Sequence, residues 1–366
     1  MSVFSTKAEG STGRLIQLCM GYFTFYVATG LIVKAFTGSV NGQPARMNDI
    51  AFLAYNTLGA NLTCLIPSVA LGWWHLKTIR PLKLGSHEIP SELLYIIPSG
   101  ICTAVVIPTT TLMYTLPISV MVAMVIMRAS VIVIGRVVDE VQIRQGILDK
   151  QVYWEENAAV VFAVLAASIE LTGTNGGSFD FLRNRAAVVI LSSYIGAYAI
   201  RIYLMNYYKN TRPKGEPLDN KAFFAVEQIA ASAVMILLAA GFYFAPRLFP
   251  SWGGVRQISS FVGAIQVPSP FWGWAAASGL AFGAVAFFSV FIFMFKGRTA
   301  TFTGLVNRLT SLVAGTTATL LGWAFLGSRF PSRQNWVSLG FVLVAVAFLT
   351  GAERKRSREL VAAKEI

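Results

Sequence analysis

Apolar runs long enough to cross a lipid bilayer recur along the whole chain. A transmembrane helix needs about 20 predominantly apolar residues, and ten runs near that length alternate with charged or Pro- and Gly-rich breaks. The predicted spans are 15–36, 50–74, 92–112, 116–138, 156–173, 186–207, 221–245, 271–295, 299–326 and 335–352. This pattern predicts an all-α polytopic membrane protein with ten transmembrane helices.

The composition excludes an ordinary soluble domain. Charged residues make up only 13% of the 366 residues, whereas soluble domains carry about 25%. The net charge of +13 would suggest nucleic acid as the partner of a soluble chain. Here the basic residues cluster between the apolar runs, where they set topology and meet anionic lipid headgroups. We therefore expect the lipid bilayer, and no nucleic acid, as a partner.

The distribution of Lys and Arg predicts the orientation of the chain. Ten spans place both termini on one side, and 19 of the 30 Lys and Arg residues fall there, against 8 on the other side and 3 inside spans. Cytoplasmic loops carry the excess of positive charge, so we expect both termini in the cytoplasm. A bacterial inner membrane is the favoured location, and a eukaryotic endomembrane is the alternative.

The two halves of the chain resemble each other. The segment "MRASVIVIG" aligns with "NRLTSLVAG" at an offset of 180, which places Arg128 over Arg308. We predict a duplication of five helices. Because five is odd, the two copies cross the membrane in opposite senses, a recurrent design of transporters whose site lies near the midplane.

Similar offsets extend the alignment to neighbouring helices. The dipeptide "SG" at 99–100 falls over "SG" at 278–279, and Asn56 falls over Glu227. The predicted segments are a cytoplasmic N-tail (1–14), a first repeat (15–173), a connecting loop (174–185), a second repeat (186–352) and a basic cytoplasmic C-tail (353–366).

Residues 299–351 resemble the last two helices of an EamA-type domain, and the whole pattern resembles the drug/metabolite transporter superfamily. The segment "MVIMRASVIVIG" is similar to the fourth-helix arginine segment of its nucleotide-sugar transporter-like branch. The resemblance implies five-plus-five inverted repeats with a cavity lined by the first and sixth helices. It would place on that cavity four tyrosines that are spaced four apart in pairs: Tyr22, Tyr26, Tyr194 and Tyr198.

Two arginines are predicted deep inside the membrane. At 1.5 Å rise per residue, Arg128 and Arg308 lie about 15 Å or more from the ends of their spans. An arginine at a helix centre costs about 2.5–3.5 kcal/mol on insertion scales, so each needs a watery cavity or a partner. Two interpretations are open. The pair binds an anionic substrate, or it is structural and is held by an ion pair with Glu227 or by hydrogen bonds to helix-end carbonyls.

Further polar residues complete the candidate site. Lys34 and Arg201 lie late in the first helix of each repeat and are candidates for a gate or a charge partner. The remaining candidates for substrate binding are Asn56, Glu227, Gln228 and Asn307.

Enzymatic and ATP-driven functions find no support in the sequence. No HxxxxD, HExxH, GxSxG or GxxxxGK[ST] pattern occurs, and these patterns carry nucleophile, metal or phosphate chemistry. The three cysteines lie in apolar runs without CxxC spacing, and the two histidines share one loop without nearby cysteines. We expect no enzyme, no cofactor and no metal site.

The expected function is secondary transport of a small organic metabolite, by alternating access around a midplane site. The favoured substrate is an anion: a nucleotide-sugar, a sugar phosphate or a carboxylate, bound by the planar guanidinium groups. The alternative is an exporter of amino acids, amines or drugs in which the arginines are structural. Expected partners are the substrate, a coupling proton or counter-substrate, and a second copy through the small residues of spans 156–173 and 335–352.

Overall fold

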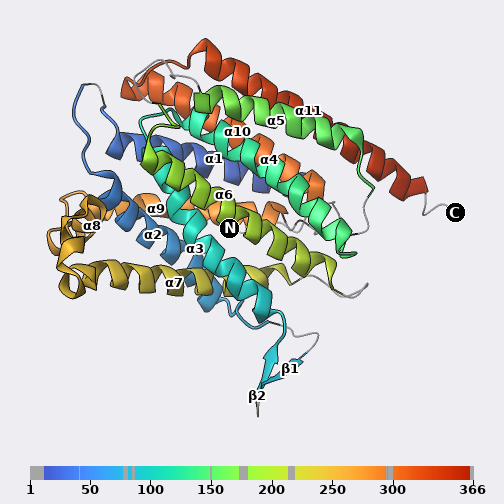
Figure 1. The fold of residues 1–366 in the computed structure, drawn as a ribbon, viewed down its shortest axis with the longest axis horizontal. Coiled ribbons are helices and arrows are strands. Elements are labelled where there is room, and N and C mark those ends of the chain that lie inside the picture. The colour runs from blue at the N-terminus through green and yellow to red at the C-terminus, as the bar shows by residue number, and fades with distance from the viewer. Residues whose placement is uncertain are drawn as a thin grey trace, which may run out of the picture.

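The computed structural model describes residues 12–40, 42–76, 81–84, 87–148, 151–172, 180–212, 219–293, 295 and 300–362. Within them the chain forms a bundle of long α-helices (Figure 1). The first half contains α1 (Thr12–Thr37), α2 (Asp49–Ala70), α3 (Leu93–Thr115), α4 (Val120–Arg144) and α5 (Trp154–Thr172). The second half contains α6 (Arg185–Asn210), α7 (Asn220–Leu248), α8 (Arg256–Gln266), α9 (Trp272–Phe293), α10 (Ala300–Leu326) and α11 (Arg333–Ala362).

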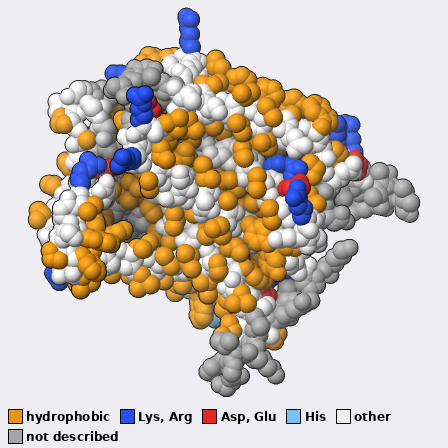
Figure 2. Space-filling model, viewed as in Figure 1, with side chains coloured by type: hydrophobic (Ala, Val, Ile, Leu, Met, Phe, Trp, Pro, Cys, Tyr) orange, Lys and Arg blue, Asp and Glu red, His pale blue; other side chains and the backbone are white. Residues whose placement is uncertain are grey.

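Every predicted span corresponds to a helix. Nine helices in the described part of the chain are long and apolar enough to cross a membrane. The remaining predicted span is α5, which has 19 residues and carries Glu155 and Glu156 in its first turn and Glu170 near its end. Figure 2 shows a face dominated by hydrophobic side chains with scattered Lys and Arg, as expected of a surface that meets lipid. The chain is therefore a polytopic membrane protein.

The all-α prediction needs one correction. The α2–α3 connection contains two short antiparallel strands, β1 (Pro81–Leu84) and β2 (His87–Pro90), with Leu84 paired to His87. The hairpin projects from the end of the bundle (Figure 1). Prolines at its ends suit an edge position, since a proline lacks an N–H for further ladder bonds. The α7–α9 connection is also partly helical, with a 3₁₀ turn (Pro250–Gly254) followed by α8.

Two helices continue beyond their predicted spans. The predicted span 116–138 is extended by α4 to Arg144, where Glu140 forms i,i+4 ion pairs with Arg136 and Arg144. Such pairs stabilise an exposed helix end. The last helix, α11, runs to Ala362, so most of the predicted basic tail 353–366 is helical.

Small residues bring α5 and α11 together. Ala159, Ala163 and Ala166 of α5 are fully buried with Ala345 of α11 in one cluster, and the two helices run side by side (Figure 1). Small side chains allow close backbone approach where lipid gives no hydrophobic driving force. The face predicted for packing or dimerisation is thus used within the chain, and a second copy would meet the larger side chains outside it.

Candidate functional site

Arg128 lies at the centre of α4 and is held by two tyrosines of α1. Its Nη2 donates hydrogen bonds to the hydroxyls of Tyr22 and Tyr26, at 3.2 and 2.9 Å. Its guanidinium carbon also lies 5.6 Å from the centroid of the Tyr26 ring. The residue is only 5% exposed. A cation buried in this way is stabilised by charge-assisted hydrogen bonds and by the ring face.

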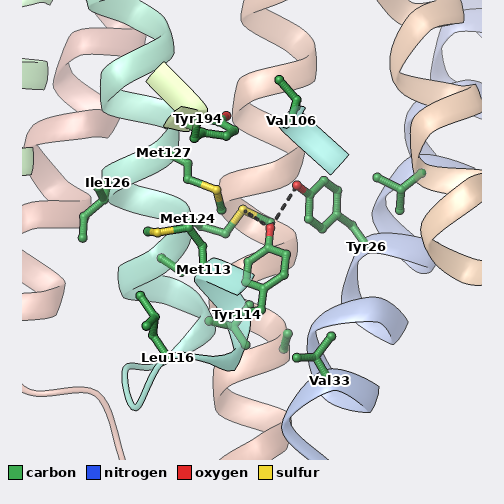
Figure 3. Close-up of a cluster of buried hydrophobic side chains, with 14 of the residues drawn as sticks. Tyr26, Val33, Val106, Met113, Tyr114, Leu116, Met124, Ile126, Met127 and Tyr194 are labelled. Atoms are coloured by element: carbon green, nitrogen blue, oxygen red, sulfur yellow. Dashed lines mark hydrogen bonds between the residues drawn. The ribbon is translucent and has the colours of Figure 1, made fainter. Parts of the chain in front are cut away.

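The tyrosines extend the contact of Arg128 across the bundle. The Tyr114 hydroxyl lies 3.0 Å from the Tyr26 hydroxyl and 3.3 Å from the Met124 sulfur (Figure 3). Residues of α1, α3 and α4 therefore form one buried layer, which we call the central layer: Tyr22, Tyr26, Tyr114, Met124 and Arg128.

The second repeat joins this layer through Asn307. The Tyr22 hydroxyl donates to Asn307 Oδ1 at 3.3 Å, and Asn307 Nδ2 donates to Ser289 Oγ at 3.1 Å. Asn307 is fully buried on α10, and Ser289 belongs to α9. The hydrogen bonds thus connect the two halves of the chain at the level of Arg128.

Arg308 has a different environment from Arg128, although the two align in the sequence. Its Nη2 donates to the carbonyl oxygen of Val131 at 3.3 Å, and its Nε, like the Nε of Arg128, is buried without a hydrogen-bond partner among the described residues. The side chain faces a cavity of about 140 Å³, which we call the inner cavity because it lies toward the predicted cytoplasmic side. A buried donor without a partner is costly, so Arg308 is suited to receive an acceptor from a ligand.

The inner cavity is rich in charged residues. Its ionisable walls are the cations Arg136, Arg201, Lys209 and Arg308 and the acids Asp139 and Glu156.

Several of these charges are neutralised by the protein. Arg136 pairs with Glu140 at 3.0 Å, and Glu156 pairs with Arg356 of α11 at 2.6 Å. Arg201 is paired as well, as described below. Within the described part of the chain, Lys209 and Arg308 are the cavity cations without an ion pair.

Glu227 forms its ion pair with Arg201. The Arg201 guanidinium donates from Nε and Nη2 to the two carboxylate oxygens at 2.9 and 2.8 Å. Ser99 and Thr103 of α3 donate to the same carboxylate at 2.5 and 3.2 Å. Glu227 is fully buried. In the described residues Glu227 thus pairs with Arg201 and not with Arg128 or Arg308, so one of the two structural roles expected for these arginines is not formed.

A second cavity, the outer cavity, lies at the opposite end of the bundle and has a volume of about 690 Å³. Lys34 of α1 lines it and donates to the carbonyl oxygen of Leu116 at 2.8 Å. Its other polar walls are Ser39, Ser119, Thr319, Ser328, Arg329, Ser332 and Asn335.

The central layer separates the two cavities. Along α4, residues 118–122 meet the outer cavity and residues 132–139 meet the inner one, with Arg128 between them. At 1.5 Å per residue, Arg128 lies about 9 Å from Val122 of the outer cavity and about 6 Å from Ile132 of the inner one along the helix. The order on α10 is consistent, with Arg308 at the inner cavity and Thr319 at the outer one.

Of the other predicted residues, some line a cavity and others lie at helix interfaces. Tyr194 and Tyr198 are buried on α6 with ring centroids 5.1 Å apart, and Tyr198 lines the inner cavity. Asn56 donates to Ser278 Oγ at 2.8 Å between α2 and α9 and lines neither cavity. Gln228 is 1% exposed and likewise lines neither one.

The sequence analysis missed some residues of the path. Tyr114 was hidden because "YTLP" reads as a break between two spans, whereas α3 continues to Thr115. Lys209 and Asp139 were counted as loop charges because they lie beyond the predicted spans. Asp139 and Lys209 lie one and two residues beyond the ends of the predicted spans 116–138 and 186–207, and this closeness is the signal that the sequence offers. Among the described residues, no group of His, Cys, Asp and Glu is arranged to hold a metal ion.

Comparisons with known proteins add little to this geometry. No family model and no curated protein matches the sequence. A solved structure described only as "Crystal structure of protein" superposes with a TM-score of 0.45 at 12% identity, covering 94% of this chain and 99% of the other. The site is therefore interpreted from its own residues.

Proposed function

We propose that this protein is a secondary transporter of a small organic anion, belonging to the drug/metabolite transporter superfamily that its sequence resembles. The observation that carries the proposal is the inner cavity, where Arg308 and Lys209 have no ion pair. Cations in a partly desolvated cavity attract an anion more strongly than they would in water. The guanidinium offers a planar fork that matches a carboxylate or a phosphate.

The packing supports the inverted repeat on which this mechanism depends. Glu227 accepts a hydrogen bond from Ser99 between α7 and α3, and Asn56 donates one to Ser278 between α2 and α9. In the sequence alignment Asn56 falls over Glu227 and Ser99 falls over Ser278, so the two contacts join equivalent positions. The packing of α1 on α10 likewise corresponds to that of α6 on α4. A two-fold relation between the halves requires such paired contacts.

The volume favours the smaller substrates of the expected class. Drug-sized ligands occupy pockets of about 300–1,000 Å³, whereas the inner cavity measures about 140 Å³. Carboxylates and small phosphate esters fit this space better than nucleotide-sugars do. Alternating access would then open the central layer and pass the anion toward the outer cavity.

The alternative, export of amino acids, amines or drugs, assigns the arginines a structural role and needs a free carboxylate for a cation. One observation favours it: Arg128 is hydrogen-bonded to Tyr22 and Tyr26 of its own chain. Glu227, a buried candidate for that carboxylate, is neutralised by Arg201. The charge of the inner cavity therefore supports an anion as the primary proposal.

The test is uptake into liposomes that contain the purified chain, with a panel of carboxylates, sugar phosphates, nucleotide-sugars and amines. Loss of a hydrogen bond to a charged group costs about 1.5–3 kcal/mol, so Arg308→Gln should reduce anion uptake by roughly 10- to 150-fold. The control is Arg183→Gln, because Arg183 is 90% exposed and pairs with Asp180 away from both cavities. Anion uptake at the wild-type rate by Arg308→Gln would refute the proposal.

A further inference from the structure

The outer cavity contains a lysine whose hydrogen bonds are only partly used. The Lys34 ammonium lies in the last turn of α1 and donates one bond, to Leu116. A lysine ammonium has three N–H donors. Two donors are therefore left for whatever enters the cavity.

The charge of the outer cavity has one sign. Its lining in the described residues includes Lys34 and Arg329 as cations and no aspartate or glutamate. The inner cavity, by contrast, has acids as well as bases in its walls. Lys34 has no ion pair among the described residues, and its positive charge raises the local concentration of anions in the cavity.

We propose that the outer cavity is a second anion-binding site, in which Lys34 binds the carboxylate or phosphate group of the ligand. The volume of about 690 Å³ falls in the range of pockets for organic ligands. Ser119 adds a hydroxyl group to the wall of this cavity. Its oxygen accepts from Val122 N–H, and its O–H can donate to the same anion.

This site is distinct from the inner cavity. Lys34 lies eight residues beyond Tyr26 on α1, or about 12 Å along the helix, and Tyr26 belongs to the central layer that separates the cavities. Binding at Lys34 does not rest on transport through the inner cavity. A soluble anion and the headgroup of an anionic lipid are two sources of the same chemistry.

Lys34 and Lys209 line different cavities, so their labelling rates report on the outer and the inner cavity separately. The purified full chain is placed in phosphatidylcholine nanodiscs and treated briefly with a water-soluble amine-acylating reagent. Peptide mass spectrometry then measures the labelling rate of Lys34 in the outer cavity and of Lys209 in the inner one. The probe is inorganic phosphate, compared with sodium chloride at equal ionic strength. Parallel nanodiscs contain phosphatidylglycerol without phosphate.

Phosphate should slow the labelling of Lys34 by the factor 1 + [phosphate]/Kd, or about elevenfold at ten times Kd. Arg308→Gln should keep this protection, because Arg308 lies on the other side of the central layer. Protection by phosphatidylglycerol instead of phosphate would support the same site with a lipid headgroup as its ligand.

Equal labelling of Lys34 in chloride, phosphate and phosphatidylglycerol would overturn the proposal. Protection of Lys34 that disappears in Arg308→Gln would also overturn it, because the effect would then report the inner cavity. The labelling rate of Lys209 distinguishes anion binding in the outer cavity from the proposed transport through the inner cavity. If phosphate protects Lys34 but neither protects Lys209 nor inhibits anion uptake, the proposed transport fails and the outer site stands.

Discussion

Arg201 and Glu227 form a two-point ion pair between α6 and α7, with donor–acceptor distances of 2.9 and 2.8 Å. The carboxylate is fully buried, and the arginine side chain is 13% exposed. This pair lies beside the inner cavity, which Arg201 lines. It fixes two helices of the second repeat while cancelling a charge that would otherwise repel an anion.

Removing one partner of this pair should destabilise the protein strongly. Breaking a buried ion pair leaves an uncompensated charge and costs about 3–5 kcal/mol. We expect Arg201→Met to lower the thermal midpoint in detergent far more than Arg183→Met at an exposed site. The double variant Arg201→Met/Glu227→Leu should recover much of the loss, because it buries no lone charge. Equal midpoints for Arg201→Met and wild type would show that the pair contributes nothing.

The hydroxyl of Tyr26 should matter for both stability and transport. It accepts from Arg128 and also contacts Tyr114, so Tyr26→Phe removes two contacts of the central layer. A hydrogen bond to a charged group contributes about 1.5–3 kcal/mol, and we expect a loss of that size in the free energy of unfolding. Transport in liposomes should fall as well, since the layer separates the two cavities. Tyr243→Phe is the control, because the contacts of Tyr243 with the described residues are made by its ring, to Phe244 and Arg247.

Two glycines at aligned positions should respond alike to substitution. A Cβ added to Gly279 would lie 2.1 Å from the Asn56 carbonyl oxygen, and one added to Gly100 would lie 2.7 Å from the Glu227 carbonyl oxygen. Overpacking of this kind costs about 1–3 kcal/mol. We expect both alanine variants to lower the thermal midpoint. Gly241→Ala, with nothing within 4 Å of the new Cβ, should be close to neutral.

This glycine prediction also tests the inverted repeat. If Gly100→Ala and Gly279→Ala both melt like the wild type, the close approach of α3 to α7 and of α2 to α9 is wrong. If only one is destabilised, the two halves differ in packing at positions that their sequences align.

The sequence predicted that Arg128 lies inside a long apolar helix, and the structure places it buried within α4. The sequence could not predict what Arg128 contacts, since Tyr22 and Tyr26 lie more than 100 residues away and meet it because α1 and α4 both pack on α10. The same limit applies to Glu227. Its partner, Arg201, lies near a helix end in the sequence, and the two meet because α6 and α7 both pack on α3.

The alignment of Arg128 with Arg308 predicted equal roles, and here the environments differ. Arg128 contacts tyrosine hydroxyls, whereas Arg308 contacts a backbone carbonyl and a cavity. Equivalent positions in a repeat share a backbone path, but their side chains meet different neighbours once the two halves have diverged. Arg308 therefore lines the inner cavity without a symmetry-equivalent arginine in the outer one, where Lys34 is the lining cation of α1.

The cytoplasmic extension of α11 should loosen at low pH. Lys355 of α11 contacts Glu155, which precedes the predicted span 156–173, and holds the pKa of that carboxyl below its ordinary value of 4.5. A depressed pKa means that the contact stabilises the folded state above the unfolded value and is lost as pH falls through the folded one. Amide hydrogen exchange over residues 353–362, corrected for intrinsic rates, should accelerate below pH 4.5.

Glu155→Gln is the matched variant for this pH effect, because it keeps the shape of the side chain and removes the charge. We expect the variant to exchange faster than the wild type at neutral pH and to show a smaller further change on acidification. The neighbouring pair Glu156–Arg356, at 2.6 Å, should retain part of the protection in the variant. The helix α8 lies away from these contacts and provides an internal reference. A wild-type extension whose corrected exchange is the same at neutral and acidic pH would contradict the role of Glu155.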